Sequence, residues 1–177
     1  IKLLGIYDSV FVGGAIANDL LKARGLPVGR SIISEITPAP EVLNHPKLLI
    51  PTDVTVEDEN GQASIKKAID VAKGDKIVDI GPDSFADIAR IVRAAKFVLW
   101  NGPTGLYEGG YDEWTEAVAQ AVAGASAHTV VGGGDTVTTI SKLGIEEKYT
   151  FLSTAGGALL EFLSDGTLPG IRALEAS

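Results

Sequence analysis

Short, largely apolar stretches recur along the chain, and most of them end abruptly in glycine. Six of these stretches predict β-strands, at residues 9–12, 48–50, 77–80, 97–100, 129–131 and 150–152. Their apolar residues run together instead of alternating with polar ones, which is typical of strands that are buried on both faces of a parallel sheet.

The segments between these strands carry apolar residues three or four positions apart, which is the spacing of one helical face. They predict helices over residues 15–24, 83–95 and 157–163, and a further helix that begins at Asp112. Regular alternation of strands and helices favours an α/β fold. We therefore expect a single domain over residues 1–177, with a three-layer, Rossmann-like parallel sheet of about six strands and helices on both faces.

One stretch departs from this alternation. Val54 and Val56 lead into an acidic turn that ends in Asn60-Gly61, and residues 63–67 follow. Because Asn-Gly adopts positive φ at low cost, this pattern predicts a β-hairpin, which we interpret as a solvated excursion from the main sheet. Residues 35–46 contain three prolines and are expected to be irregular.

The charge balance and the composition exclude several classes of function. The 177 residues include 15 Lys and Arg against 23 Asp and Glu, a formal net charge of −8, so the chain has no basic surplus for binding nucleic acid through its phosphates. The absence of cysteine excludes disulfides and thiolate sites and fits a cytoplasmic protein. No apolar run approaches the ~18 residues of a membrane-spanning helix, so no membrane partner is expected. The chain begins at Ile1 and contains no methionine, and we interpret it as part of a longer polypeptide.

Four glycine-rich segments follow predicted strands, at residues 13–15, 101–105, 132–136 and 153–157. Right-handed crossovers place the carboxyl ends of parallel strands at one edge of a sheet, so we expect these segments to converge. Glycine permits close backbone approach, and the helix behind each segment supplies unpaired N–H groups, which together favour a polyphosphate site. The alternative for any one segment is an ordinary tight turn, which needs glycine anyway.

The triple glycine at residues 132–134 delivers Asp135 and Thr136 to the first turn of a helix. There the Asp135 carboxylate can hold Mg²⁺ while the following N–H groups face phosphates, although a simple N-cap role for Asp135 remains open. Standard nucleotide motifs are missing, because no Gly-Lys-Ser/Thr occurs and the first loop reads GGAIAN instead of GxGxxG.

In these same segments the sequence resembles the C-terminal, nucleotide-binding lobe of phosphoglycerate kinase. WNGPTGLYE at residues 100–108 is similar to the family pattern W-N-G-P-x-G-h-[FY]-E, where h is apolar, and VVGGGDT at residues 130–136 matches V-V-G-G-G-D-[ST]. VDIGP at residues 78–82, STAGGA at residues 153–158 and LPG at residues 168–170 extend the likeness, in family order, over the whole chain.

The resemblance implies a transferase that moves phosphate between ATP and 3-phosphoglycerate with Mg²⁺ in glycolysis. It implies ATP or ADP as the partner of this lobe, 3-phosphoglycerate as the partner of an N-terminal lobe that this chain lacks, and a monomer. Carried over by position, Gly13, Gly14 and Val78 border the adenine, Glu108 binds the ribose hydroxyls, and Asn101 contacts the phosphates.

The remaining roles fall on the later loops. Asp135 serves the magnesium ion. The nucleotide-binding residues implied in this way are Gly13, Gly14, Val78, Asn101, Glu108, Gly132, Gly133, Gly134, Asp135, Thr136 and Ser153. Those implied beside the transferring phosphoryl group are Gly134, Thr136, Thr154, Gly156 and Gly157.

The sequence also departs from the family pattern. A pair of lysines in a K-V-x-x-K pattern is absent, because Lys2 comes too late to replace either, and Ala155 stands where the first glycine of S-T-G-G-G is expected. A supplied cation is worth about 10³ to 10⁵ in the rate of comparable phosphoryl transfers, so we expect this polypeptide alone to bind MgADP or MgATP with little or no turnover. From about Arg172 onward we expect poor order, with Ile171 and Leu174 left exposed.

Two other functions stay open at this point. A non-catalytic nucleotide-binding module is favoured by the absent lysines and by Ala155. A Rossmann-type oxidoreductase requires an acidic residue after the second strand to bind the ribose of NAD, and Asp53 is a poor candidate because the hairpin follows it.

Overall fold

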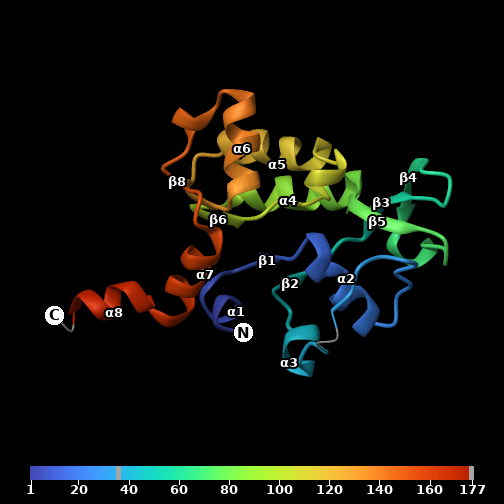
Figure 1. The fold of residues 1–177 in the computed structure, drawn as a ribbon, viewed down its shortest axis with the longest axis horizontal. Coiled ribbons are helices and arrows are strands. Elements are labelled where there is room, and N and C mark those ends of the chain that lie inside the picture. The colour runs from blue at the N-terminus through green and yellow to red at the C-terminus, as the bar shows by residue number, and fades with distance from the viewer. Residues whose placement is uncertain (35–36, 176–177) are drawn as a thin grey trace.

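The computed structural model describes residues 1–34 and 37–175, and its strands lie in three small sheets (Figure 1). In the first, β1 (Val10–Phe11) pairs in parallel with β2 (Leu48–Leu49). In the second, β6 (Phe97–Asn101), β7 (His128–Gly132) and β8 (Phe151–Ser153) pair in parallel in that order. These two sheets confirm the prediction of parallel strands.

The third sheet is antiparallel and contains the predicted hairpin. β3 (Asp53–Glu57) pairs with β4 (Ala63–Lys67) on one side and with β5 (Lys76–Ile80) on the other. The hairpin is confirmed, but β3 is no solvated excursion, because Val54 and Val56 are fully buried. β3 therefore pairs antiparallel with β5, whereas a fully parallel sheet was expected around β5.

The six predicted strands all form, but they do not form one continuous sheet. Among the described residues, no ladder of hydrogen bonds joins β1 to β6, and a mainly apolar cavity of about 240 Å³ lies between them. Its lining includes Val10, Phe11, Trp100, Val118 and Val122. The prediction of a single sheet was wrong because apolar runs identify strands without specifying which edge each one pairs with.

Five helices follow strands as the sequence predicts. They are α2 (Gly14–Ala23), α4 (Pro82–Ala94), α5 (Glu113–Ala123), α6 (Gly134–Leu143) and α7 (Gly156–Asp165). The sequence pattern does not predict α1 (Lys2–Ile6), α3 (Pro40–Leu43) or the 3-10 turns η1 (Ala68–Asp70), η2 (Tyr107–Gly109) and η3 (Glu146–Lys148). α3 lies within the segment expected to be irregular, of which residues 35 and 36 lie outside the described residues. These elements are too short to show a helical period.

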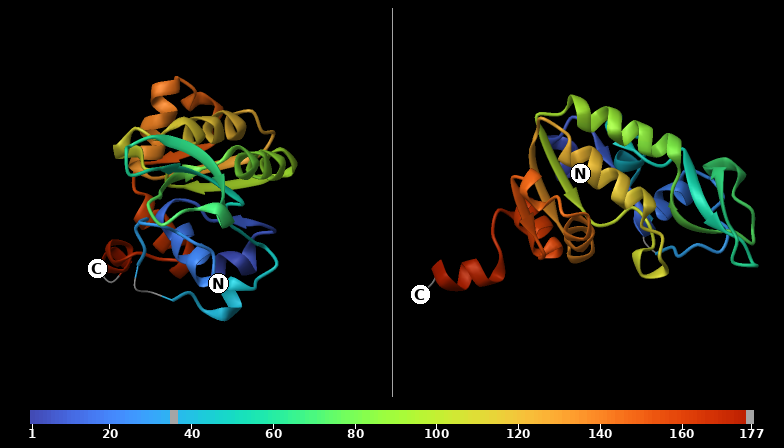
Figure 2. Two further views of the ribbon diagram at one scale, coloured as in Figure 1. Left: turned by 90° about the vertical axis from the view of Figure 1, so that its right-hand side faces the viewer. Right: turned by 90° about the horizontal axis from the view of Figure 1, so that it is seen from above.

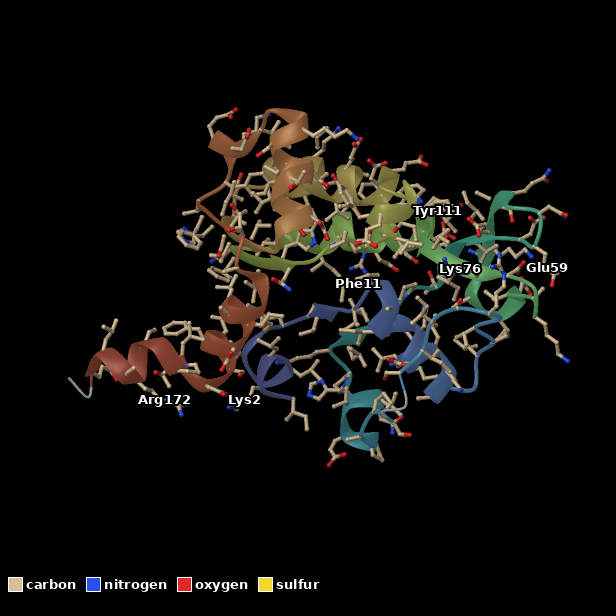
Figure 3. All side chains as sticks on the ribbon, viewed as in Figure 1. Lys2, Phe11, Glu59, Lys76, Tyr111 and Arg172 are labelled. Atoms are coloured by element: carbon tan, nitrogen blue, oxygen red, sulfur yellow. The ribbon has the colours of Figure 1, made fainter. Side chains whose placement is uncertain are left out.

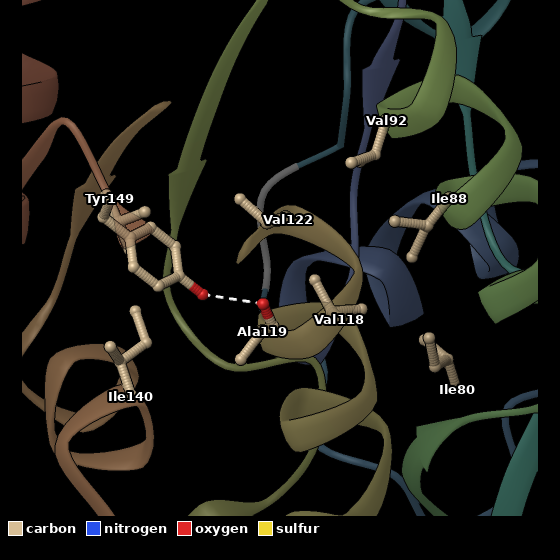
Figure 4. Packing of buried hydrophobic residues seen from close by; sticks show 9 residues of the cluster. Ile80, Ile88, Val92, Val118, Ala119, Val122, Ile140 and Tyr149 are labelled. Carbon is tan, nitrogen blue, oxygen red and sulfur yellow. Dashed lines mark hydrogen bonds between the residues drawn. The ribbon is translucent and has the colours of Figure 1, made fainter. Parts of the chain in front are cut away.

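The largest apolar cluster lies where α4, α5 and α6 meet β5 and β7 (Figure 4). Ile80, Val122 and Ile140 are at most 1% exposed, and burying an aliphatic side chain of this size contributes roughly 1.5–3 kcal/mol. Tyr149 joins the cluster, and its hydroxyl donates a 2.7 Å hydrogen bond to the carbonyl of Ala119. Burial raises the pKa of Tyr149. This cluster fixes the position of α6, whose first turn meets one of the glycine loops.

The C-terminal helix α8 (Pro169–Glu175) extends away from the rest of the molecule in Figure 1 and in the right-hand view of Figure 2. The prediction of poor order from Arg172 onward was wrong for residues 172–175, because a regular helix begins at Pro169 and continues to Glu175. Residues 176 and 177 lie outside the described residues. Leu174 is 80% exposed, as expected, whereas Ile171 is partly covered. In the described part of the chain, no helix is both long enough and apolar enough to cross a membrane.

The first turn of α4 depends on a carboxylate from another element, which gives a test of the fold. Asp53 on β3 accepts hydrogen bonds from the N–H groups of Asp83 (2.9 Å) and Ser84 (2.8 Å). We expect Asp53→Ala to lower the free energy of unfolding by about 0.5–2 kcal/mol, the usual range for a lost helix cap, measured by urea denaturation. Asp87→Ala is the matched control on the same helix, since its side chain is 47% exposed. Equal effects of the two substitutions would contradict the capping role.

Candidate functional site

The four glycine segments meet at one edge of the molecule, as predicted. The segments at residues 13–15, 101–105, 132–136 and 153–157 follow β1, β6, β7 and β8, and each is joined to the next by a backbone hydrogen bond. The three bonds run from Gly14 N–H to the Thr104 carbonyl (3.2 Å), from Gly102 N–H to the Gly132 carbonyl (3.3 Å), and from Gly133 N–H to the Ser153 carbonyl (3.0 Å). The loops therefore form one connected surface, even though the sheets behind them are separate.

Three helices begin at these loops without a side-chain cap. The residues that precede α2, α6 and α7 are Gly13, Gly133 and Ala155, and none of their side chains accepts a capping hydrogen bond. The first N–H groups of a helix have no partner within the helix, and the aligned peptide dipoles place a partial positive charge there. Several such ends side by side provide donors for an anionic group.

The first turn of α4 is different, because its donors are already used. The carboxylate of Asp53 accepts from two N–H groups there, and the Ser84 hydroxyl donates a further bond to it at 2.6 Å. A protein carboxylate thus occupies the position that an anionic ligand would take. This contrast separates α4 from the three helices that start at the glycine loops.

Asn101, the last residue of β6, is wedged between two of the other loops. A Cβ built on Gly132 or on Gly156 would lie 2.6 Å from its Oδ1, and the one on Gly156 would also lie 2.8 Å from the nitrogen of Gly133. Such distances leave no room for a side chain at either glycine. The Oδ1 atom itself is buried and has no hydrogen-bond partner among the described residues. Glycine at these positions thus lets the loops close around the Asn101 amide.

Asp135 and Thr136 lie in the first turn of α6, where the sequence analysis placed them. Asp135 is exposed, whereas Thr136 is fully buried, and its Oγ1 has no partner among the described residues. In the described part of the chain, no three acidic or histidine side chains group closely enough to hold a metal ion. A lone exposed carboxylate beside open N–H groups fits the way Mg²⁺ is often bound, through one carboxylate, ligand phosphates and water.

A cavity of about 410 Å³ opens beside the first two loops. Gly13, Gly14, Val78 and Asn101 line it, so the residues expected around an adenine lie together with the residue expected at the phosphates. Glu108 is not among the described residues that line this cavity. It lies in the exposed turn η2.

The structure also adds residues to this cavity that the sequence analysis did not single out. Ile16, Asn18 and Leu106 line it, and Asn18 is only 4% exposed. The Nδ2 of Asn18 donates to the carbonyl of Ile32 at 3.0 Å, which holds α2 against the following loop. A signal for Asn18 was present, because it follows Gly14 by four residues and so lies on the same face of the helix.

The model of one protein family, phosphoglycerate kinase, matches residues 1–166 of this sequence. The chain belongs to the phosphoglycerate kinase family.

Relatives and solved structures agree with this assignment. The phosphoglycerate kinase of Francisella tularensis subsp. novicida is 42% identical over 185 residues, which cover 98% of this chain and 47% of the relative. The structure of phosphoglycerate kinase from Coxiella burnetii has a TM-score of 0.83 at 37% identity, and covers 97% of this chain and 47% of that one. The enzyme from Pyrococcus horikoshii gives a TM-score of 0.79 at 27% identity, with 98% of this chain and 48% of the other covered. The chain thus spans about half the length of its relatives, and these likenesses confirm the Rossmann-like α/β class.

The phosphoglycerate kinase motifs coincide with the connected loops. The implied site residues that lie in these loops or line the 410 Å³ cavity are Gly13, Gly14, Val78, Asn101, Gly132, Gly133, Gly134, Asp135, Thr136, Ser153, Thr154, Gly156 and Gly157. Glu108 is the member of the set that lies apart from them, in η2.

Ala155 fits its position without strain. Its backbone has φ −93° and ψ 61°, so this residue does not need the positive φ that only glycine adopts freely. Its N–H donates to the Ser153 hydroxyl at 3.2 Å, which forms a local turn before α7. The departure from the phosphoglycerate kinase pattern at this position therefore leaves the loop intact.

A buried acid, Asp79, borders the site. In the sequence it stands out only as part of the VDIGP motif at residues 78–82. It is the fourth residue of β5, is 4% exposed, and lines the 410 Å³ cavity. Burial raises the pKa of Asp79 to about 7, although hydrogen bonds from the Ile80 N–H, the Thr104 hydroxyl and the Trp114 N–H oppose the shift. The negative charge of Glu113 raises the pKa further. The carboxyl group is thus divided between its neutral and charged forms near neutral pH.

The close contact at Gly156 predicts a difference between two neighbouring glycines. A Cβ on Gly156 would meet Asn101 and Gly133 at less than 3 Å, whereas one on Gly157 would meet nothing within 4 Å. We expect Gly156→Ala to lower the free energy of unfolding by roughly 1–3 kcal/mol, as overpacking does, and to weaken nucleotide binding. Gly157→Ala is the matched control and should leave stability nearly unchanged. Thermal denaturation and calorimetric titration with MgADP measure both, and a Gly157→Ala variant as damaged as Gly156→Ala would refute the steric argument.

Proposed function

We propose that this chain is the nucleotide-binding lobe of a phosphoglycerate kinase, a single lobe over residues 1–177 that binds MgADP or MgATP. In the complete enzyme this lobe serves the transfer of phosphate between ATP and 3-phosphoglycerate. The observation that carries the proposal is the set of three uncapped helix ends on connected glycine loops, beside a cavity, in a chain of this family.

The base and the sugar are assigned to the first part of the site. The adenine lies in the 410 Å³ cavity between Gly13, Gly14 and Val78, and this volume falls within the range of small-molecule pockets, about 300–1,000 Å³. The ribose hydroxyls then face Glu108, whose carboxylate is exposed in η2 and can accept hydrogen bonds from them. This placement requires η2 to turn its acid toward the cavity when nucleotide binds.

The phosphates are assigned to the later loops. The N–H groups at Gly134 and Thr136 begin α6 and those at Gly156 and Gly157 begin α7, so both helix ends can donate to phosphate oxygens. Asn101 lies between these two loops and contacts the phosphates with its amide. Asp135 holds Mg²⁺, which neutralises phosphate charge when it is bound.

Binding and catalysis separate in this proposal. The four loops contain no lysine or arginine, and helix ends contribute roughly 0.3–1 kcal/mol each, far less than the rate effect of a supplied cation. The chain spans 47% of the length of its Francisella relative, so we assign 3-phosphoglycerate and the accelerating cations to the part of the enzyme that this chain does not cover. On its own the chain binds nucleotide with little or no turnover. The family's place in glycolysis supports a cytoplasmic enzyme, and we propose that it is a monomer.

The proposed metal site gives a direct test. We expect Asp135→Ala to weaken MgADP binding roughly 10- to 100-fold, which corresponds to the loss of an interaction with a charged group. With EDTA present the wild-type chain and the variant should bind ADP alike, because the metal is then gone. Asp87→Ala, a surface carboxylate on α4, is the control that should bind MgADP normally. Calorimetry measures all three chains.

A turnover assay tests the division between binding and catalysis. With ATP, Mg²⁺ and 3-phosphoglycerate, we expect the 177-residue chain to form ADP at a rate at least about 10³-fold below that of a full-length phosphoglycerate kinase. Comparable rates would overturn the assignment of the cations to another part of the enzyme. Failure to bind MgADP at all would overturn the proposed function itself.

A further inference from the structure

Two oxygen atoms from different elements face the same point beside Gly105. A Cβ built on Gly105 would lie 2.4 Å from Oδ2 of Asp79 and 2.4 Å from the backbone carbonyl oxygen of Tyr111. Figure 3 shows Tyr111 close to the strands of the antiparallel sheet that contains Asp79. Both oxygens lie close to the position that a Cβ on Gly105 would take, so the absence of a side chain there leaves room for both.

Among the described residues, no hydrogen bond is donated to Oδ2 of Asp79, although the Thr104 hydroxyl and the Trp114 N–H act on the same carboxyl group. A carbonyl oxygen only accepts hydrogen bonds, and so does a charged carboxylate. Oδ2 of Asp79 is buried and has no hydrogen-bond partner among the described residues, whereas Oδ1 accepts from the Ile80 N–H at 2.7 Å. Two acceptors that face the same point repel each other, and a proton on one of them allows a hydrogen bond between them.

We propose that neutral Asp79 donates a hydrogen bond from Oδ2 to the Tyr111 carbonyl and thereby positions the segment of residues 105–111, which carries Glu108. Loss of the proton breaks this bond and releases the segment. Asp79 is thus a positioning residue that acts on the nucleotide site through Glu108. The proposal rests on the proposed function only for this last link to nucleotide binding.

Backbone hydrogen bonds within the segment, from the Gly109 N–H to the Leu106 carbonyl (2.9 Å) and from the Gly110 N–H to the Tyr107 carbonyl (3.0 Å), make it a tight turn that is held to the rest of the chain at its two ends. At one end the N–H of Leu106 donates to the Val78 carbonyl at 2.7 Å, and at the other the Tyr111 hydroxyl donates to Glu57 at 2.7 Å. Between them, residues 108–110 are exposed. A bond at the Tyr111 carbonyl therefore adds a restraint at the point where this exposed stretch returns to the sheet.

The charged groups around Asp79 favour its neutral form. On α5, Glu113 acts on it as a like charge. On the paired strand β3, Asp53 is held at the first turn of α4, and Glu57 is paired with Arg30 and Tyr111. Burial is the larger cause, and together with Glu113 it raises the pKa of Asp79 to about 7.

The sign of the pH dependence follows from this pKa. A carboxyl group whose pKa is higher in the folded chain than in the unfolded one holds more protons when folded, so stability falls as pH rises between the two values. For Asp79 this interval runs from the ordinary 3.8 to about 7. The hydrogen bond to Tyr111 is likewise present below about pH 7 and lost above it.

The first experiment follows the proton without nucleotide. In a chain labelled with ¹³C at aspartate carboxyl carbons, we expect the Asp79 signal to titrate with a midpoint near 7, and the backbone amide signals of Gly109 and Gly110 to shift with the same midpoint. Asp79→Asn carries a permanent donor in the same shape, so its loop signals should stay at the low-pH position. An Asp79 midpoint below pH 5, or loop signals that titrate equally in Asp79→Asn, would overturn the proposal.

A second variant keeps the test valid if Asp79→Asn does not fold. Glu113→Gln removes the like charge and should move the midpoint to lower pH for the Asp79 carboxyl and for the loop amides together. A shift in the midpoint of the Asp79 carboxyl without an equal shift in the midpoint of the loop amide signals would also contradict the proposed hydrogen bond. Asp87→Asn on the surface of α4 is the control that should change neither.

The last measurement connects the segment to nucleotide. We expect the MgADP affinity of the wild-type chain, divided by that of Asp79→Asn at the same pH, to fall about 2- to 10-fold between pH 6 and pH 8.5, because one hydrogen bond is lost. Taking the ratio cancels the titration of ADP itself. A constant ratio would overturn the link through Glu108. If neither chain binds MgADP at any pH, the proposed function is refuted. The NMR midpoints then still test the hydrogen bond between Asp79 and the Tyr111 carbonyl.

Discussion

The structure depends on the starts of α2, α6 and α7, where the preceding residue provides no side-chain cap for the first N–H groups, although the N–H of Gly14 donates to the Thr104 carbonyl. A buried donor without a partner is costly, so proteins normally cap helix ends, as Asp53 does for α4 here. At the glycine loops the chain has no such cap, and the donors remain at the surface of the connected loops. In the proposed function an anionic ligand completes their hydrogen bonding, so the same feature that weakens these helix ends suits them to binding.

Close approach of the loops is the second requirement, and Asn101 shows how it is met. Its side chain occupies the space that a Cβ on Gly132 or Gly156 would need. Gly132 and Gly156 therefore act through the volume they leave empty, whereas Gly14, Gly102 and Gly133 in the same loops adopt positive φ. Ala155 supports this distinction, because its backbone is ordinary and its side chain is exposed, so the position tolerates a methyl group. At Gly132 and Gly156, which face another loop at less than 3 Å, no such tolerance exists.

The sequence predicted the local elements and the meeting of the loops, but not how the strands pair. The runs ending at Val12, Trp100 and Val131 identify strands, and the direction of parallel crossovers places their glycine loops at one edge. Nothing in those runs shows that β3 takes the edge of β5, or that β1 and β6 stay apart, because pairing depends on contacts between distant residues. The sequence does not predict a role for Asp79 for a related reason. The proposed role depends on Gly105 and Tyr111, which lie near Asp79 only in the folded chain.

A net charge of −8 would be expected to disfavour the binding of a polyphosphate, which the proposed function requires. The two effects act over different distances. Long-range attraction between charges is screened over about 10 Å in salt, whereas N–H groups in contact with a phosphate act at about 3 Å in partly dehydrated surroundings. Fixed donors bind the ground state and the transition state about equally when the charge at their position does not change during the reaction. Such donors hold a nucleotide without accelerating transfer. Acceleration requires charge aimed at the moving phosphoryl group, and the four loops carry no lysine or arginine that could supply it.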